Sequence, residues 1–156
     1  MILGIGVDLC RLSRITALLQ RGPAFRQRFT QRILHPVEWH EFQALTQGSD
    51  PANDKASSRL QLSPPVEFDP SKTPAGNVCL QEHLVRYLAT RWAAKEAVYK
   101  ALYPTHSLSW KDVAVAKRSG KPYLHFQDPS KHGINQSHLS ISHDGDLVIA
   151  QVVLEA

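Results

Sequence analysis

Three ionisable residues, widely separated in the chain, have the types that a metal-assisted phosphate reaction uses. Asp8 closes an apolar N-terminal segment, whereas Glu96 and Lys100 lie four residues apart in a helix-like segment. Residues i and i+4 share one helix face, so Glu96 and Lys100 project from the same side. A carboxylate at the end of an apolar strand is costly unless it meets solvent, a donor or a cation. Together these features indicate phosphate chemistry at a metal ion.

Magnesium is the cation that two carboxylates from separate segments would suit. Mg²⁺ binds hard oxygen ligands, typically one or two carboxylates completed by substrate phosphates and waters. Cys10 is not expected to be a ligand, because magnesium disfavours sulfur. Ordinary structural roles also stay open at this point. A surface Glu–Lys pair at i and i+4 contributes only about 0.2–0.5 kcal/mol, and Asp8 could simply cap a turn.

Two elements distant in the sequence must bring these residues together. Residues 2–9 are strand-like and contain two glycines, where a backbone can approach its neighbour closely. Residues 81–103 predict the longest helix, which Pro104 stops. Its apolar side is formed by Leu84, Leu88, Ala94, Val98, Ala101 and Leu102.

The remaining periodic segments are short. Helices are predicted at 13–21 with Ser13 as cap, at 24–30 and at 36–45. The third of these makes Val37, Phe42 and Leu45 available for burial. Two hairpins are predicted after the long helix, with strands at 112–118 and 123–126 around a 119–122 turn, then at 138–143 and 147–154.

A proline-rich segment interrupts this pattern at residues 46–83. Five of the ten prolines lie in it, among Ser, Asp, Lys and Gly, and no periodicity is visible. We interpret it as a flexible insertion in a single domain that spans residues 1–156, because 156 residues correspond to one ordinary domain.

Composition excludes several classes of protein. Apolar residues make up 42% and charged residues 21% of the chain, and no apolar run approaches the roughly 20 residues of a membrane span. The chain begins on its first strand-like segment, so we expect no secretion signal. Cys10 and Cys79 form neither a zinc-finger spacing nor a disulfide framework, which favours a reducing intracellular compartment.

Positive charge is concentrated near the N-terminus. The formal net charge is +4, and residues 11–32 contain no Asp or Glu. Arginines occur in this stretch at positions 11, 14, 21, 26, 28 and 32. The stretch is typical of a face that docks an anionic partner, although a merely solvated basic face would have the same composition.

Four separated motifs resemble one family. They are Gly4-Ile5-Gly6-Val7-Asp8, the helical segment 91–102, the hairpin residues Gly120-Lys121-Pro122-Tyr123, and the strand Ser140-Ile141-Ser142-His143. In content and order they resemble the holo-acyl-carrier-protein synthases of the 4'-phosphopantetheinyl transferase superfamily. The resemblance covers about the first 45 residues and everything after about Leu84. It implies an α+β fold in which an antiparallel sheet packs against the long helix.

The resemblance implies transfer of the phosphopantetheine arm from coenzyme A to a serine of an apo-acyl carrier protein, with release of adenosine 3',5'-bisphosphate. By motif position, Asp8 and Glu96 would hold Mg²⁺. Glu96, Lys100 and Asp8 would form the catalytic set, with Glu96 or a water accepting the serine proton and Lys100 acting on the departing group. The residues matched to coenzyme A binding are Lys100, His143, Ser142, Gly120, Lys121, Pro122 and Arg91.

The resemblance also implies partners. Arg14 matches a family position that meets the acidic carrier protein, with Arg11, Arg21, Arg26 and Arg28 nearby. Members of the small subclass form homotrimers with coenzyme A in the clefts between protomers. The presence of Cys10, where larger relatives have a second acid, fits that subclass. The length of the 46–83 segment departs from bacterial members and is more typical of eukaryotic ones.

Two other functions stay open on sequence grounds. A non-catalytic module could bind RNA or another polyanion through the arginines, but it would not explain why Asp8, Glu96 and Lys100 occur together, and 8% aromatic residues offer no recognisable stacking platform. A degenerate relative could hold coenzyme A without transferring anything. We expect an enzyme with no nucleic-acid or membrane partner, in the cytoplasm or, for a eukaryotic source, in the mitochondrial matrix.

Overall fold

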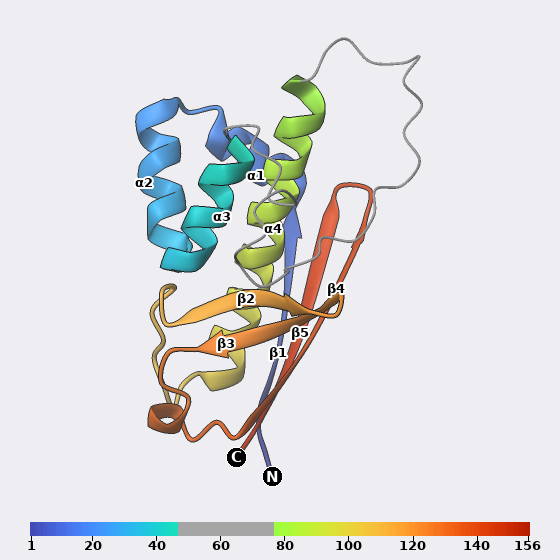
Figure 1. The fold of residues 1–156 in the computed structure, drawn as a ribbon. Helices are drawn as coiled ribbons and strands as arrows, with labels where there is room; N and C mark the ends of the chain where they lie inside the picture. The colour runs from blue at the N-terminus through green and yellow to red at the C-terminus, as the bar shows by residue number, and fades with distance from the viewer. Residues whose placement is uncertain (47–76) are drawn as a thin grey trace.

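The computed structural model describes residues 1–46 and 77–156, and side chains in the second range from Glu82 onward. Its elements are β1 (Ile2–Arg11), α1 (Leu12–Leu19), α2 (Pro23–Ile33), α3 (Pro36–Thr46), α4 (Asn77–Leu102), β2 (Val113–Arg118), β3 (Lys121–Phe126), the 3-10 turn η3 (Ser130–His132), β4 (Gln136–Asp144) and β5 (Leu147–Glu155). Figure 1 shows α1–α3 beside the N-terminal half of α4, with the strands against the rest of that helix. The expected α+β class is confirmed.

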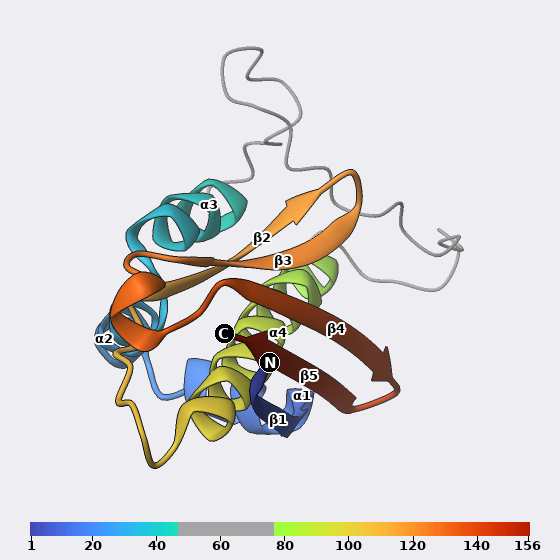
Figure 2. The same ribbon diagram turned by 90° about the horizontal axis from the view of Figure 1, so that it is seen from below.

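Two antiparallel sheets make up the β layer. One has the strand order β1-β5-β4, and the other is the hairpin of β2 and β3. Figure 2 shows the three-stranded sheet on one side of α4 and the β2–β3 hairpin on another side of the same helix. The predicted antiparallel sheet on a long helix is therefore present, but it is divided into two parts.

Strand β1 lies directly on α4 because it presents glycines there. A Cβ atom on Gly4 would come within 1.8 Å of the Ala101 carbonyl oxygen, and one on Gly6 within 1.8 Å of that of Ala97. Only glycine permits this approach of two backbones. On the helix side, small buried residues recur every four positions at Ala89, Ala93, Ala97 and Ala101. The close contact fixes how far Asp8, the next residue on this strand face, lies from the helix.

The three-stranded sheet has one buried and one exposed face. Side chains alternate along a strand, so the inner face of β5 carries the buried residues Val148, Ala150, Val152 and Leu154. The outer face of the same sheet is apolar along β1 and at one position of β5. The exposed hydrophobic residues Ile5, Val7, Leu9 and Ile149 form this open apolar face. The same side of β4 carries the exposed polar residues His138, Ser140 and Ser142.

A buried carboxylate connects the helices to the hairpin. Glu38, 1% exposed, accepts hydrogen bonds from the ammonium group of Lys95 at 2.6 Å and from the backbone N–H of Val115 at 2.8 Å. It also accepts one from the N–H of His35 at 2.8 Å, at the start of α3. One side chain therefore joins α3, α4 and β2.

Several boundaries differ from those expected from the sequence. Helix α1 begins at Leu12, and Ser13 lies inside it rather than capping it. The hairpin turn needs only Ser119 and Gly120, whose φ angles of 50° and 80° fit a two-residue turn, so Lys121 and Pro122 belong to β3. Val37 is 54% exposed, and its predicted burial is wrong, since α3 turns its other side to the core.

The long helix begins before the expected position. Helix α4 runs from Asn77 to Leu102. Its first residues therefore lie in the segment 46–83 that the sequence predicts as an insertion. Residues 47–76, which the sequence predicts as a flexible insertion, lie outside the described residues. No helix in the described part of the chain is long and apolar enough to cross a membrane.

Candidate active site

Asp8 and Lys100 meet across the contact between β1 and α4. The Lys100 ammonium donates to Asp8 Oδ1 at 2.8 Å and to the Val7 carbonyl at 2.9 Å. The Asp8 side chain is only 14% exposed, whereas that of Lys100 is 50% exposed. Asp8 thus lies at the edge of the buried β1–α4 contact. The long side chain of Lys100 reaches it from the solvent side.

Glu96 lies one helical turn before Lys100 and faces the same corner. Partial burial, and then the charge of Asp8, raise the pKa of its carboxyl group, while Lys100 and Arg14 act in the opposite direction. Among the described residues, no hydrogen bond or ion pair engages its carboxylate. The two acids predicted to act together are therefore close enough to repel each other, and a cation between them would relieve this repulsion.

The donor set suits a hard divalent cation. Asp8 and Glu96 both offer carboxylate oxygens, and one or two of these are what Mg²⁺ uses alongside phosphate. Burial raises the pKa of Cys10 to about 11, so its thiol stays protonated and is a poor ligand. Within the described ranges there is no cluster of three or more His, Cys, Asp or Glu residues that could hold a metal alone. Two protein ligands leave the remaining positions to a bound phosphate and water.

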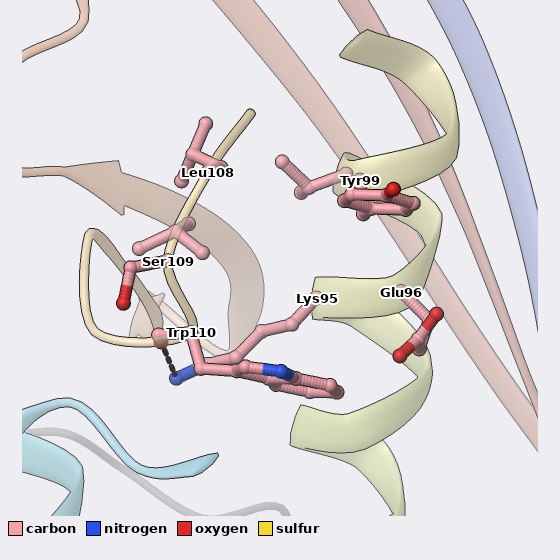
Figure 3. Close-up of a pocket in the computed structure, with 8 residues that line it drawn as sticks. Lys95, Glu96, Tyr99, Leu108, Ser109 and Trp110 are labelled. Carbon is pink, nitrogen blue, oxygen red and sulfur yellow. Dashed lines mark hydrogen bonds between the residues drawn. The ribbon is translucent and has the colours of Figure 1, made fainter. Parts of the chain in front are cut away.

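A small pocket opens beside Glu96. Figure 3 shows it between the α4 residues Lys95, Glu96 and Tyr99 and the facing loop residues Leu108 and Trp110. The Trp110 carbonyl accepts a hydrogen bond from Lys95 at 2.8 Å, which ties the loop to the helix. The pocket holds about 220 Å³, less than the roughly 300–1,000 Å³ of ordinary ligand sites. This pocket by itself is too small to enclose a molecule the size of coenzyme A.

Aromatic rings extend from this pocket toward the basic helices. The Trp92 ring lies 4.8 Å from that of Trp110 and 5.9 Å from that of Phe29, measured between centroids. The Arg14 guanidinium lies over Trp92 at 5.1 Å, and that of Arg21 over Phe25 at the same distance. Arg14, the arginine predicted to meet a carrier protein, therefore lies over Trp92, four positions before Glu96.

The other predicted basic residues of this face lie in the solvent. Arg11 ends β1, Arg21 follows α1, and Arg26 and Arg28 lie on α2, all with exposed side chains. Together with Arg14 they occupy neighbouring elements, since α1 packs against both α2 and α4.

Arg91 is placed away from the two acids. It is 9% exposed, its guanidinium lies 3.4 Å over the Tyr87 ring, and it approaches Glu41 at 3.6 Å and Glu38 at 3.9 Å. The structure brings this predicted coenzyme A residue to α3 rather than to Asp8, and its predicted role stays a prediction.

The remaining predicted coenzyme A residues are spread over the two sheets. Gly120 and Lys121 are exposed at the tip of the β2–β3 hairpin, and Pro122 is half-buried. His143 shares a register row with Cys10 on the inner sheet face, two rows from Asp8, whereas Ser142 shares a row with Leu9 on the outer face. A single chain therefore does not gather them around Asp8, and their roles stay predictions.

Sequence reasoning missed the buried pair of Glu38 and Lys95. A signal was present, because Arg91 and Lys95 interrupt the apolar row that Leu88 and Val98 continue along α4. Charged residues are seldom fully buried without a partner, so an acid elsewhere in the chain should have been sought. The pair holds the pocket wall at Trp110 and the end of α2 at Ile33, whose carbonyl accepts from Lys95 at 2.8 Å.

Comparison with known proteins identifies the class. The model of the 4'-phosphopantetheinyl transferase superfamily matches residues 4–152. The chain belongs to that superfamily.

Within it, the relatives point to one type. The chain is 36% identical over 159 residues to "4'-phosphopantetheinyl transferase B, mitochondrial" of Aspergillus fumigatus, covering 97% of this chain and 92% of the relative. It is 30% identical, with a TM-score of 0.67 and full coverage of both chains, to the holo-[acyl-carrier-protein] synthase of Neisseria meningitidis. The synthase of Bacillus anthracis, solved in complex with CoA (3',5'-ADP), is 28% identical with a TM-score of 0.63 and covers 100% of this chain and 98% of its own. This chain is thus similar to the holo-[acyl-carrier-protein] synthases.

Proposed function

We propose that this protein transfers 4'-phosphopantetheine from coenzyme A to a serine of an apo-acyl carrier protein. The products are holo-acyl carrier protein and adenosine 3',5'-bisphosphate. The observation that carries the proposal is the meeting of Asp8, Glu96 and Lys100 at one corner of the β1–α4 contact, in a chain of this superfamily. In the reaction the serine oxygen forms a bond to the phosphorus that carries pantetheine, and the bond from that phosphorus to the bridging oxygen breaks.

Asp8 and Glu96 would hold Mg²⁺ against the diphosphate of coenzyme A. When bound, the ion would polarise the attacked phosphate and stabilise negative charge on the leaving group. Among the described residues no hydrogen bond occupies the Glu96 carboxylate, so an oxygen that the ion does not use is free to accept a proton. Glu96 therefore accepts the serine proton, directly or through a water.

Lys100 acts on the leaving phosphate. Its ammonium ends a long side chain that is half exposed, and its contacts are to Asp8 and to the Val7 carbonyl at the open edge of the site. From there it can neutralise the charge that collects on the released adenosine 3',5'-bisphosphate. It can also supply the proton that this group takes up.

The active assembly is a homotrimer in this proposal. The open apolar face at Ile5, Val7, Leu9 and Ile149 is the kind of surface that marks a protein–protein contact. In this proposal coenzyme A lies in the cleft between neighbouring chains, as the resemblance implies, so the small pocket beside Glu96 need not enclose it alone.

The carrier protein docks on the arginine face formed by Arg11, Arg14, Arg21, Arg26 and Arg28. Carrier proteins are acidic, so this face attracts them electrostatically, and salt screens the attraction. Arg14 lies over Trp92, and Trp92 lies on the same α4 face as Glu96. A carrier bound at Arg14 therefore presents its serine close to the two acids.

The decisive experiment is a mass assay on purified apo-carrier protein with coenzyme A and Mg²⁺. Wild-type protein should add the mass of phosphopantetheine, and Asp8→Ala, Glu96→Ala and Lys100→Ala should each lose most of this activity. Lys111→Ala, which removes an exposed lysine from the loop before β2, is the matched control and should keep it. Absence of any mass gain with the wild-type protein, over a panel of apo-carriers, would refute the proposal. A protein that binds RNA but modifies no carrier would favour the polyanion-binding alternative.

For the compartment, the proposal is the cytoplasm, with the mitochondrial matrix as alternative. The matrix is supported by the mitochondrial designation of the Aspergillus fumigatus relative. Fluorescence of the tagged protein in cells of the source organism decides between the two.

A further inference from the structure

The first helix lacks a capping side chain of its own. The residue at the N-cap of α1 is Arg11, whose side chain makes no capping hydrogen bond, and the first turn contains no acidic residue. The first four N–H groups of any helix have no partner within the helix. Some other segment must therefore satisfy the start of α1.

Asp146, in the turn between β4 and β5, supplies this cap. Its Oδ1 accepts from the Ser13 N–H at 2.8 Å, and its Oδ2 accepts from the Ser13 hydroxyl at 2.7 Å. Its backbone carbonyl accepts from the Leu12 N–H at 2.8 Å, and Arg11 lies 3.9 Å from the carboxylate. The two hydrogen bonds from Ser13 lower the pKa of Asp146, so the carboxylate is charged when it faces the positive end of the helix.

The cap joins two parts of the proposed site that are far apart in sequence. On one side, Asp146 follows His143 by three residues at the end of β4. On the other, Ser13 precedes Arg14, whose guanidinium reaches the Trp92 ring. A helix of eight residues is too short to be stable alone, so the anchoring of its first turn and the burial of Ile15 and Leu19 together determine where Arg14 lies.

We propose that Asp146 is a positioning residue for carrier recognition, which holds α1 so that Arg14 stays over Trp92 and meets the acidic helix of the carrier protein. This inference rests on the proposed function. Asp146 itself need touch neither coenzyme A nor the carrier serine. It acts through Ser13 and the orientation of α1.

The test compares steady-state kinetics of Asp146→Ala, Asp146→Glu and Asp144→Ala. Asp144 is the last residue of β4, two before Asp146, is exposed, and its side chain makes no hydrogen bond in the described part of the chain. Its replacement makes the same change of charge without removing the cap. Loss of a cap corresponds to about a fivefold effect on an equilibrium. The KM for the carrier should therefore rise about fivefold in Asp146→Ala, while the KM for coenzyme A changes less than twofold.

A second measurement follows the helix itself. Amide hydrogen exchange in residues 12–16 should accelerate in Asp146→Ala and return toward the wild-type rate in Asp146→Glu, which can still accept both hydrogen bonds. Asp144→Ala should leave exchange and both KM values unchanged.

Three results would overturn the inference. They are an unchanged carrier KM in Asp146→Ala, an equal rise in Asp144→Ala, and a rise in the KM for coenzyme A as large as that for the carrier. Wild-type protein that modifies no carrier would refute the proposed function and this inference with it. Active wild-type protein with an unaffected Asp146→Ala variant would refute this inference alone.

Discussion

Replacement of Gly6 by alanine should damage both catalysis and stability. The added Cβ would lie 1.8 Å from the Ala97 carbonyl oxygen, whereas ordinary van der Waals contact begins near 3.4 Å. The obstacle is helix backbone, which cannot rotate away, so β1 must retreat from α4 by about 1.6 Å. Asp8 follows Gly6 on the same strand face and would retreat with it, away from Glu96 and Lys100.

The size of both effects follows from this displacement. Overpacking of a core costs about 1–3 kcal/mol, which for a chain of this length lowers the Tm by roughly 2–12 °C. Misplacement of a catalytic group by about 1 Å can cost about 100-fold in rate. We therefore expect kcat/KM in the mass assay to fall about 100-fold in Gly6→Ala, in protein that still melts cooperatively.

Gly4→Ala is the matched control. Its Cβ would meet the Ala101 carbonyl oxygen at the same 1.8 Å, but it lies four residues from Asp8 instead of two. Its loss of Tm should be similar and its loss of kcat/KM about tenfold smaller. Gly6→Ala protein with wild-type activity, or equal losses of activity in the two variants, would contradict the idea that the glycines set the position of Asp8.

Three further changes test the fold and the assembly. Lys95→Met removes the cation nearest to the buried Glu38 and should cost about 3–5 kcal/mol in urea unfolding. The double variant with Glu38→Gln should regain part of this, and a stable single variant would show that the pair is dispensable. Burial raises the pKa of Tyr87, so above the ordinary tyrosine pKa of about 10 the unfolded chain loses a proton that the folded chain keeps. Stability should then fall with rising pH, and less steeply in Tyr87→Phe; parallel curves would exclude this cause. Val7→Lys places a charge on the open apolar face and should convert the proposed trimer to monomers in light scattering, whereas an unchanged mass would argue against that face as the interface.

The sequence allowed prediction of the elements that carry strong local signals. The glycine-containing strand, the long helix and both hairpins are present, because period-2 and period-3.6 patterns and turn residues are local properties. The motifs predict that Asp8, Glu96 and Lys100 act in one site. In the structure Asp8 and Lys100 form a 2.8 Å ion pair, while the roles of the three residues stay predictions. The strand order β1-β5-β4 is not predicted from the sequence, because the pairing of β1 with β5 depends on contacts between the two ends of the chain.

Other features depend on tertiary contacts that no local pattern encodes. Ser13 looks like a helix cap, but Asp146, more than a hundred residues later, takes that role. Arg91 matches a family motif, yet the acids on α3 draw it into the interior. Val37 has an apolar side chain at a position where α3 has no neighbour to cover it among the described residues. In each case a long-range partner, or its absence, outweighed the local preference.

The single hydrogen bond from Val115 to Glu38 has a consequence for motion. No backbone ladder joins β3 to β4, because the strands belong to separate sheets, and Val115 lies near the middle of β2. The body of the hairpin is anchored by this bond and by the buried side chains of Val113, Val115 and Leu124, while Gly120 and Lys121 at its tip are exposed. Bending of the tip toward an incoming nucleotide would leave the helix that carries Glu96 undisturbed, so adaptation of the rim and rigidity of the reaction centre can coexist.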